Sequence, residues 1–143
     1  TLGPGKLYNS NLFGLAARMK ELGLGPFICA HLADDPKLAA DRIRDVAGKC
    51  SLIITTGGVS VGKKDIIHDV IELLGAKRQF WGIDIKPGMP TVFSIVEDVP
   101  VISLTGNPFG AMTNFDLLIR PGKALPGSDV ITGADNRNYE GKL

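Results

Sequence analysis

A glycine-rich segment, residues 51–65, carries the clearest chemical signal in the sequence. The apolar run at residues 52–54 is typical of a buried strand, and the loop after it contains Gly57, Gly58 and Gly62, whose backbone a ligand can approach closely. An amphipathic helical pattern begins directly after this loop. A strand, a glycine loop and a helix in this order direct free backbone N–H groups and the positive end of the helix dipole at an anion. The segment therefore predicts an anion-binding loop.

Two familiar catalytic motifs fit this loop only in part. The spacing from Gly57 to Lys63 matches a phosphate-binding P-loop, but Lys64 stands where such a loop has the Ser or Thr that holds magnesium. The pattern around Ser60 matches the Gly-x-Ser-x-Gly elbow of hydrolases. The histidine that follows it, His68, comes only eight residues later, inside the expected helix. A hydrolase is therefore disfavoured, and a P-loop phosphohydrolase stays a minor alternative.

Acidic and basic side chains accompany the expected loops. Asp34 and Asp65 each follow an expected strand, so they could share a magnesium ion that bridges phosphate oxygens, or position a water. The simpler interpretation of Asp65 is a negative charge in the first turn of a helix. Asp35 is expected to cap the next helix, which leaves Asp34 available for a ligand. Lys86 could neutralise an anion, or could be a solvated surface lysine.

The remaining ionisable and thiol groups predict little chemistry. Neither His31 nor His68 has a visible partner in the sequence, so we expect each to have a structural role or to lie at the surface rather than to be catalytic. Cys29 and Cys50 form no Cys-x-x-Cys pair, so zinc is not expected. We expect both to be reduced thiols of a cytoplasmic protein. A net charge of +1 without blocks of like charge argues against nucleic-acid binding through bulk charge. The apolar runs are too short to cross a membrane, and no signal peptide is visible.

The periodicity of the chain indicates which elements hold these residues. We expect helices at 12–22, 36–47, 66–74 and 108–120, with Asp35 and Asn107 as caps, and strands at 27–32, 52–54, 80–85, 91–96 and 101–104. A hairpin turn is expected at Glu97 and Asp98. The pattern predicts a three-layer α/β/α, doubly wound, mostly parallel sheet over residues 1–122, followed by a loose tail at 123–143. Such sheets bind ligands beyond the carboxyl ends of their strands, where loops 34–36, 57–65, 86–90 and 105–108 should meet.

Five stretches of this chain together resemble the molybdopterin molybdotransferases of molybdenum-cofactor synthesis, the family to which the C-terminal part of gephyrin belongs. They cover roughly residues 5–122 in the order of the family: Tyr8-Asn9-Ser10-Asn11, Asp34-Asp35-Pro36, Thr56-Gly57-Gly58-Val59-Ser60-Val61-Gly62 with Asp65, Lys86-Pro87-Gly88 with Pro90, and Gly106-Asn107-Pro108. The resemblance implies that molybdate is joined to adenylylated molybdopterin with Mg²⁺, and that AMP is released.

The resemblance also implies roles for individual residues. Asp34, Asp65 and Lys86 would be catalytic, and the two aspartates would hold the metal. The substrate-binding set would be Gly57, Gly58, Val59, Ser60, Gly62, Pro87, Gly88, Pro90, Gly106, Asn107 and Pro108. A homodimer, and other molybdenum-cofactor enzymes as partners, are implied as well.

Several positions depart from the family pattern. Met89 stands where the family commonly has a second lysine, Phe109-Gly110 where it has Val-Ser, and Lys63 where it has an acidic residue. Family chains also carry a strand ending in Gly-Asp-Glu just before the Tyr8 region, together with further domains, so we expect a fragment, or a chain whose partner supplies the rest. These departures keep open a second hypothesis, a non-catalytic molybdopterin-binding or scaffold module of the same fold.

Overall fold

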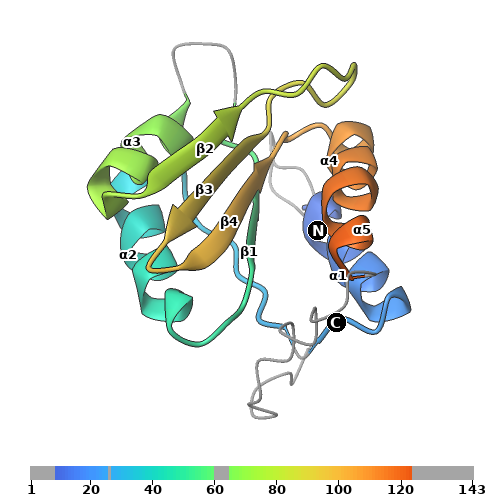
Figure 1. Ribbon diagram of the computed structural model, residues 1–143, viewed down its shortest axis with the longest axis horizontal. Coiled ribbons are helices and arrows are strands. Elements are labelled where there is room, and N and C mark those ends of the chain that lie inside the picture. The colour runs from blue at the N-terminus through green and yellow to red at the C-terminus, as the bar shows by residue number, and fades with distance from the viewer. Residues whose placement is uncertain (1–8, 26, 60–64, 124–143) are drawn as a thin grey trace, which may run out of the picture.

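A four-stranded sheet forms the centre of the molecule (Figure 1). The computed structural model describes residues 9–25, 27–59 and 65–123. The strands are β1 (Ile53–Thr56), β2 (Lys77–Trp81), β3 (Val92–Val96) and β4 (Val99–Leu104), in the spatial order β1-β4-β3-β2. β1 runs parallel to β4, with Ile53 opposite Val101 and Thr56 opposite Leu104. The other two strand pairs are antiparallel.

The α/β class is confirmed, but the described sheet is mixed rather than mostly parallel. The expected hairpin turn explains why, because Glu97 and Asp98 both have positive φ, 49° and 68°, and join β3 to β4 as antiparallel neighbours. Residues 27–32 were expected to add a strand, but they are not assigned to the sheet. β2 also begins and ends earlier than the expected 80–85, and Gly82, at φ 77°, follows its last residue.

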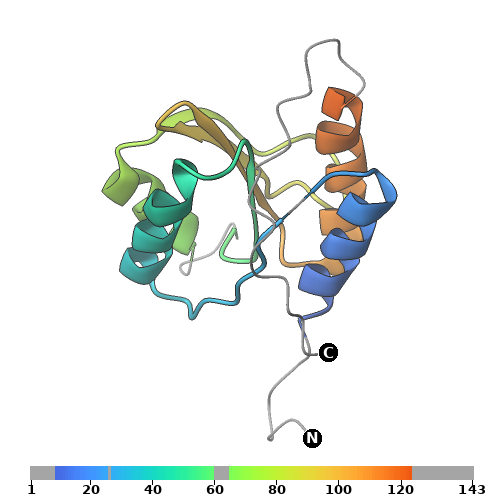
Figure 2. The ribbon, with the colours of Figure 1, turned by 90° about the horizontal axis from the view of Figure 1, so that it is seen from below.

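Helices cover both faces of the sheet (Figure 2). α2 (Pro36–Ala47) and α3 (Ile66–Leu74) pack on one face, and α1 (Ser10–Glu21) and α4 (Pro108–Asn114) on the other. α4 continues through a π-helical segment, η1 (Phe115–Ile119), into α5 (Arg120–Lys123). The expected caps are confirmed, since the Asp35 and Asn107 side chains accept from the N–H groups of Leu38 and Gly110.

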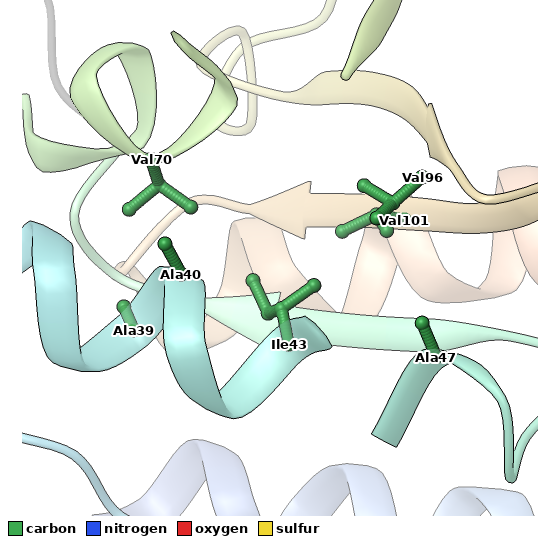
Figure 3. Close-up of a cluster of buried hydrophobic side chains, with 7 residues drawn as sticks. All are labelled: Ala39, Ala40, Ile43, Ala47, Val70, Val96 and Val101. Atoms are coloured by element: carbon green, nitrogen blue, oxygen red, sulfur yellow. The ribbon is translucent and has the colours of Figure 1, made fainter. Parts of the chain in front are cut away.

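Two apolar cores hold these layers together. On the α2–α3 side the buried side chains are small, which lets the helices approach the sheet closely; they are Ala39, Ala40, Ile43, Ala47, Val70, Val96 and Val101 (Figure 3). On the other side Phe115 and Leu104, both fully buried, lie at the centre of the core. Burying a large apolar side chain contributes about 1.5–3 kcal/mol, so both faces of the sheet stabilise the fold.

Two sequence expectations fall outside the described residues. The loose tail at 123–143 lies almost wholly in the undescribed part of the chain, and so do Ser60 and Gly62 of the glycine loop. Within the described ranges, none of the helices has the length and apolar character that a membrane crossing requires.

Candidate ligand-binding site

The loops after β1 and β4 lie against each other. Because the two strands are parallel neighbours, their carboxyl ends reach the same edge of the sheet. The Gly57 N–H donates to the Leu104 carbonyl at 3.1 Å. A Cβ atom placed on Gly106 would lie 3.5 Å from the Cα of Gly57. The structure thus brings the glycine loop and the Gly106-Asn107-Pro108 turn together at one rim, as the sequence predicts.

Glycine is required in the first loop for both conformation and space. Gly57 and Gly58 have φ values of 81° and 69°, in the left-handed region that side chains disfavour. A Cβ on Gly58 would also lie 2.7 Å from Cγ1 of Ile66. Val59, by contrast, is 4% exposed and packs with Ile67 in the core. Its side chain is therefore structural, which leaves only its backbone for the predicted contact with substrate.

Asp65 is the N-cap of α3 rather than a residue of its first turn. Its Oδ1 accepts the Ile67 N–H at 3.0 Å, and its side chain is only 6% exposed. The other oxygen, Oδ2, is buried without a hydrogen-bond partner among the described residues. It lies 3.9 Å from Nε2 of His68. Asp65 thus combines a structural role with a carboxylate oxygen whose acceptor capacity is unused.

His68 has a second partner that the sequence did not reveal. Its ring stacks on Trp81 of β2, with centroids 3.8 Å apart and planes 15° from parallel. The structural role expected for His68 thus comes from neighbours on β2 and at the start of α3, which only the fold brings to it. His31 also has a neighbour, since its Nδ1 lies 3.4 Å from Nδ2 of Asn9.

Asp34 is exposed and precedes the N-terminus of α2, with Asp35 occupied as the cap. The Ile67 N–H, which donates to Asp65, also faces the Gly58 carbonyl at 3.4 Å, so Asp65 lies beside the glycine loop. Among the described residues, no contact joins Asp65 to Asp34. No group of three or more His, Cys, Asp or Glu side chains within the described ranges is arranged to hold a metal ion. A metal shared by the two aspartates thus stays a prediction.

The turn at residues 86–90 packs against α4. The Gly88 carbonyl accepts hydrogen bonds from Asn114 Nδ2 at 2.7 Å and from Thr91 Oγ1 at 3.1 Å. A Cβ on Gly110 would lie 3.1 Å from the Cα of Gly88, so the turn and the first part of α4 are in close contact. Lys86 is exposed on this turn and free of the core.

The other predicted residues of this turn and of the Gly106 turn differ in exposure. Pro87, Gly106, Asn107 and Pro108 are exposed, whereas Pro90 is half-buried. Exposed residues on two turns that both adjoin α4 leave this part of the rim open to a ligand.

Two asparagines to which the sequence analysis assigned no role, Asn11 and Asn114, hold the rim together. Asn11 is 8% exposed, and its Nδ2 donates to the Gly106 carbonyl at 3.0 Å, which ties α1 to the turn after β4. Asn114 is fully buried and ties α4 to Gly88. One side-chain oxygen of each has no hydrogen-bond partner in the described structure. For Asn114 the available signal was an amide side chain on the apolar face of the helix expected at 108–120, whereas Asn11 precedes the helix expected at 12–22.

The pKa shifts among the described residues lie in structural groups outside the rim. Hydrogen bonds from Arg18 hold the pKa of Asp116 below its ordinary value, and the same contacts raise the pKa of Arg18. The two side chains form paired bonds of 3.0 and 2.9 Å that join α1 to η1. Burial raises the pKa of the Cys29 and Cys50 thiols.

The chain is an open-sheet α/β domain in which the loops after two parallel neighbouring strands, β1 and β4, meet at the carboxyl ends of those strands, where such sheets bind ligands. Residues 1–123 match the family model described as "Probable molybdopterin binding domain", and the chain belongs to this family. It is similar to the molybdopterin molybdenumtransferase of Bacillus subtilis strain 168, with 32% identity over 120 residues, covering 84% of this chain and 28% of that protein. Molybdopterin molybdenumtransferase 2 of Mycobacterium tuberculosis H37Rv is 33% identical over 125 residues, covering 84% of this chain and 31% of that protein.

Two solved structures resemble the fold. The molybdopterin biosynthesis MoeA protein of Pyrococcus horikoshii matches with a TM-score of 0.73 and 33% identity, over 85% of this chain and 29% of that one. The molybdopterin biosynthesis enzyme MoaB of Thermus thermophilus matches with a TM-score of 0.61 and 22% identity, over 82% of both chains. The second likeness concerns the fold alone. This chain spans less than a third of the length of the two molybdenumtransferases and of the MoeA protein.

Proposed function

We propose that this domain is the molybdopterin-binding part of a molybdopterin molybdotransferase, which joins molybdate to adenylylated molybdopterin and releases AMP. The observation that carries the proposal is the contact between the Gly57 loop and the Gly106 turn at the carboxyl ends of β1 and β4. Two glycine backbones at one sheet edge leave room for the close approach of a phosphate or molybdate oxyanion. Membership in the molybdopterin-binding family supports the choice of ligand.

Some residues of the site would bind the oxyanion, and others would neutralise its negative charge or act on the phosphoanhydride. The backbone of the two glycine turns would contact pyrophosphate or molybdate oxygens, and Lys86, exposed on its own turn, would offset their negative charge. Asp65, beside the glycine loop, would act at the phosphoanhydride through the carboxylate oxygen that the helix cap leaves unused. Asp34, exposed before α2, would assist it.

The donor chemistry of these residues fits the magnesium ion that the resemblance implies. Mg²⁺ takes oxygen ligands, and in phosphate sites it uses one or two carboxylates together with phosphate oxygens and waters. The buried, unpartnered Oδ2 of Asp65 is such a donor, and Asp34 would supply the second carboxylate. The ion would neutralise phosphate charge when bound. A cytoplasmic homodimer that passes its product to molybdenum-cofactor enzymes is also part of this proposal.

The experiment is a calorimetric titration of the chain with adenylylated molybdopterin, molybdate and Mg²⁺, followed by an assay of molybdate insertion in the full-length protein. Asp65→Asn is the informative variant, because asparagine caps a helix about as well as aspartate and removes only the charge. We expect it to lose insertion while keeping its melting temperature. Asp69→Asn, an exposed position one turn further along α3, should keep full activity. Full insertion by Asp65→Asn would contradict the proposed role.

A scaffold module is the second candidate, and two observations favour it. Asp65 already has a structural function as the cap of α3, and Met89, at the position of the family's second lysine, offers no charge. A domain that lost catalysis could keep both features. Absence of binding to adenylylated molybdopterin, molybdate and Mg²⁺ in the titration would favour the module over the enzyme.

A further inference from the structure

The antiparallel part of the sheet has an apolar surface outside the helical cores. In the strand register Phe80 lies opposite Phe93, and Ile95, two residues further along β3, lies opposite Pro100. Because alternate residues of a strand point to the same face, these four half-buried side chains share one face, which we call the open face. Phe93 also lies opposite Ile102, which packs in the core beneath α1 and α4. Among the described residues, that core contains members from β1 and β4 but none from β2 or β3.

The opposite side of β3 shows what helix cover does to the same strand. Val92, Ser94 and Val96, which alternate with the open-face residues and point toward α2 and α3, are 0%, 2% and 3% exposed. Figure 1 shows β2 and β3 at the end of the sheet farther from α1 and α4. The rings of Phe80 and Phe93 lie side by side there, with centroids 5.6 Å apart. Contiguous apolar surface of this kind, unlike single exposed side chains, indicates a contact surface.

The outer edge of β2 is not suited to extending the sheet. Lys77 and Arg78 are exposed on this strand, and its pairing with β3 is interrupted by a register shift between Arg78 and Phe80. Charged side chains and bulges are the features with which edge strands avoid pairing with another chain. A partner would therefore approach the open face rather than the strand edge.

The charges around the open face match those of a second copy. Lys77 lies opposite Ile95, so its exposed side chain is on the open-face side. Glu97 and Asp98, both exposed, form the turn between β3 and β4 at the same end of the sheet. Among the described residues, none of these three charged groups has an ion-pair partner. A two-fold axis that runs parallel to the strands over β3 would place the lysine of each copy over the acidic turn of the other.

We propose that the open face is the contact surface of a symmetric homodimer of this chain. The two copies pack this face together as aligned sheets do, with the Phe80–Phe93 pairs at the centre and the Lys77 contacts at one end. Aromatic side chains are enriched at the centre of protein interfaces, and opposite charges beside them fix the orientation. The inference rests on the proposed function, which includes a homodimer but assigns it no surface. The glycine turns follow the carboxyl ends of β1 and β4, so this contact leaves the ligand site of each copy free.

The test is a pair of charge-changed variants, each measured alone and then mixed. Sedimentation equilibrium of the unsubstituted 143-residue chain should give twice the monomer mass of 15.2 kDa. Lys77→Glu sets a glutamate against the acidic turn, and Glu97→Lys with Asp98→Asn sets a basic turn against Lys77, so each variant alone should dimerise at least about tenfold more weakly. Asparagine is used at position 98 because it tolerates the positive φ there, 68°. A mixture of the two variants should recover the dimer, since both contacts then join opposite charges.

Arg78→Glu is the matched control. Arg78 is the next residue of β2 and is also exposed, but it lies opposite Ser94 and so on the other face of the sheet. Its substitution should leave the dimer unchanged, and thermal melting of each variant checks that the fold is kept. A monomeric unsubstituted chain would overturn the proposal. A dimer that Lys77→Glu and Arg78→Glu weaken equally, or two variants that fail to recover the dimer when mixed, would overturn it as well.

The ligand titration separates this outcome from that of the proposed function. Lys77 lies on β2, away from the glycine turns, so Lys77→Glu should bind adenylylated molybdopterin, molybdate and Mg²⁺ as the unsubstituted chain does. Ligand binding by a monomeric chain would count against the open-face contact alone. A dimer that does not bind these ligands would count against the proposed ligand, and the mixing experiment would still decide the contact.

Discussion

The imidazole of His68 stacks on the indole of Trp81, with ring centroids 3.8 Å apart and an interplanar angle of 15°. The stack joins α3 to β2 and lies next to Asp65, whose Oδ2 is 3.9 Å from the same imidazole. Trp81 is the only tryptophan of the chain. Its fluorescence therefore reports directly on the start of α3, where the glycine loop ends.

His68→Ala should change the emission of Trp81. Removing the imidazole exposes the indole to water, so we expect emission at longer wavelength and with a different intensity. Aromatic pairs contribute about 0.5–1.5 kcal/mol beyond burial, so the free energy of unfolding should fall by that order. Fluorescence spectra and urea denaturation measure both effects. His31→Ala removes the other histidine, which lies beside Asn9, and should leave the spectrum unchanged; an equal change in both variants would contradict the stack.

Gly110→Ala should destabilise the domain despite the higher helix propensity of alanine. Its Cβ would lie 2.8 Å from Cγ2 of Thr105 and 3.1 Å from the Gly88 backbone, so α4 or the turn must move. Overpacking of this kind costs about 1–3 kcal/mol. Thermal denaturation measures the change. The control is Gly122→Ala in α5, where a Cβ meets nothing within 4 Å and the substitution should be neutral or stabilising. A Gly110→Ala protein as stable as this control would disprove the close contact.

Asn114→Ala should weaken both the fold and the site. The amide donates to the Gly88 carbonyl and to Thr91 Oγ1, each at 2.7 Å, in a fully buried position. Its loss leaves buried polar atoms without a partner, at a cost of about 1–3 kcal/mol. Urea denaturation should show this decrease, and pyrophosphate should bind more weakly because the 86–90 turn is less constrained. Thr113→Ala, the half-buried neighbour on α4, serves as the comparison. Unchanged stability of Asn114→Ala would show that the turn is held by other contacts.

Asp116→Asn should remove a pH-dependent part of the stability. Hydrogen bonds from Arg18 lower the folded-state pKa of Asp116 below its ordinary value of about 3.9, so the pair stabilises the fold above that value. The contribution disappears as the pH falls through the lowered folded-state pKa. The variant should therefore melt at a lower temperature at neutral pH, and the difference should shrink progressively below about pH 4. Asp41→Asn breaks an exposed pair with Arg44 and should have a smaller effect. A difference that does not depend on pH would contradict this explanation.

Local signals in the sequence determined the helix starts and the hairpin. Asp35 with Pro36, and Asn107 with Pro108, specify the beginnings of α2 and α4, because a side-chain acceptor and a fixed proline φ act within one turn. Gly75 ends α3 in the left-handed conformation for a similarly local reason. The meeting of the glycine turns at one sheet edge was also predictable, since it follows from the order of strands and helices.

Only the tertiary structure decided which side chains face one another across the fold. Asn11 reaches Gly106, and Asn114 reaches Gly88, over separations of 95 and 26 residues that no periodic pattern encodes. The sequence also did not reveal that residues 27–32 stay outside the sheet, because a strand needs a partner edge as well as apolar residues. Local propensity acts over a few residues, whereas hydrogen bonds and stacking between distant segments depend on how the whole chain packs.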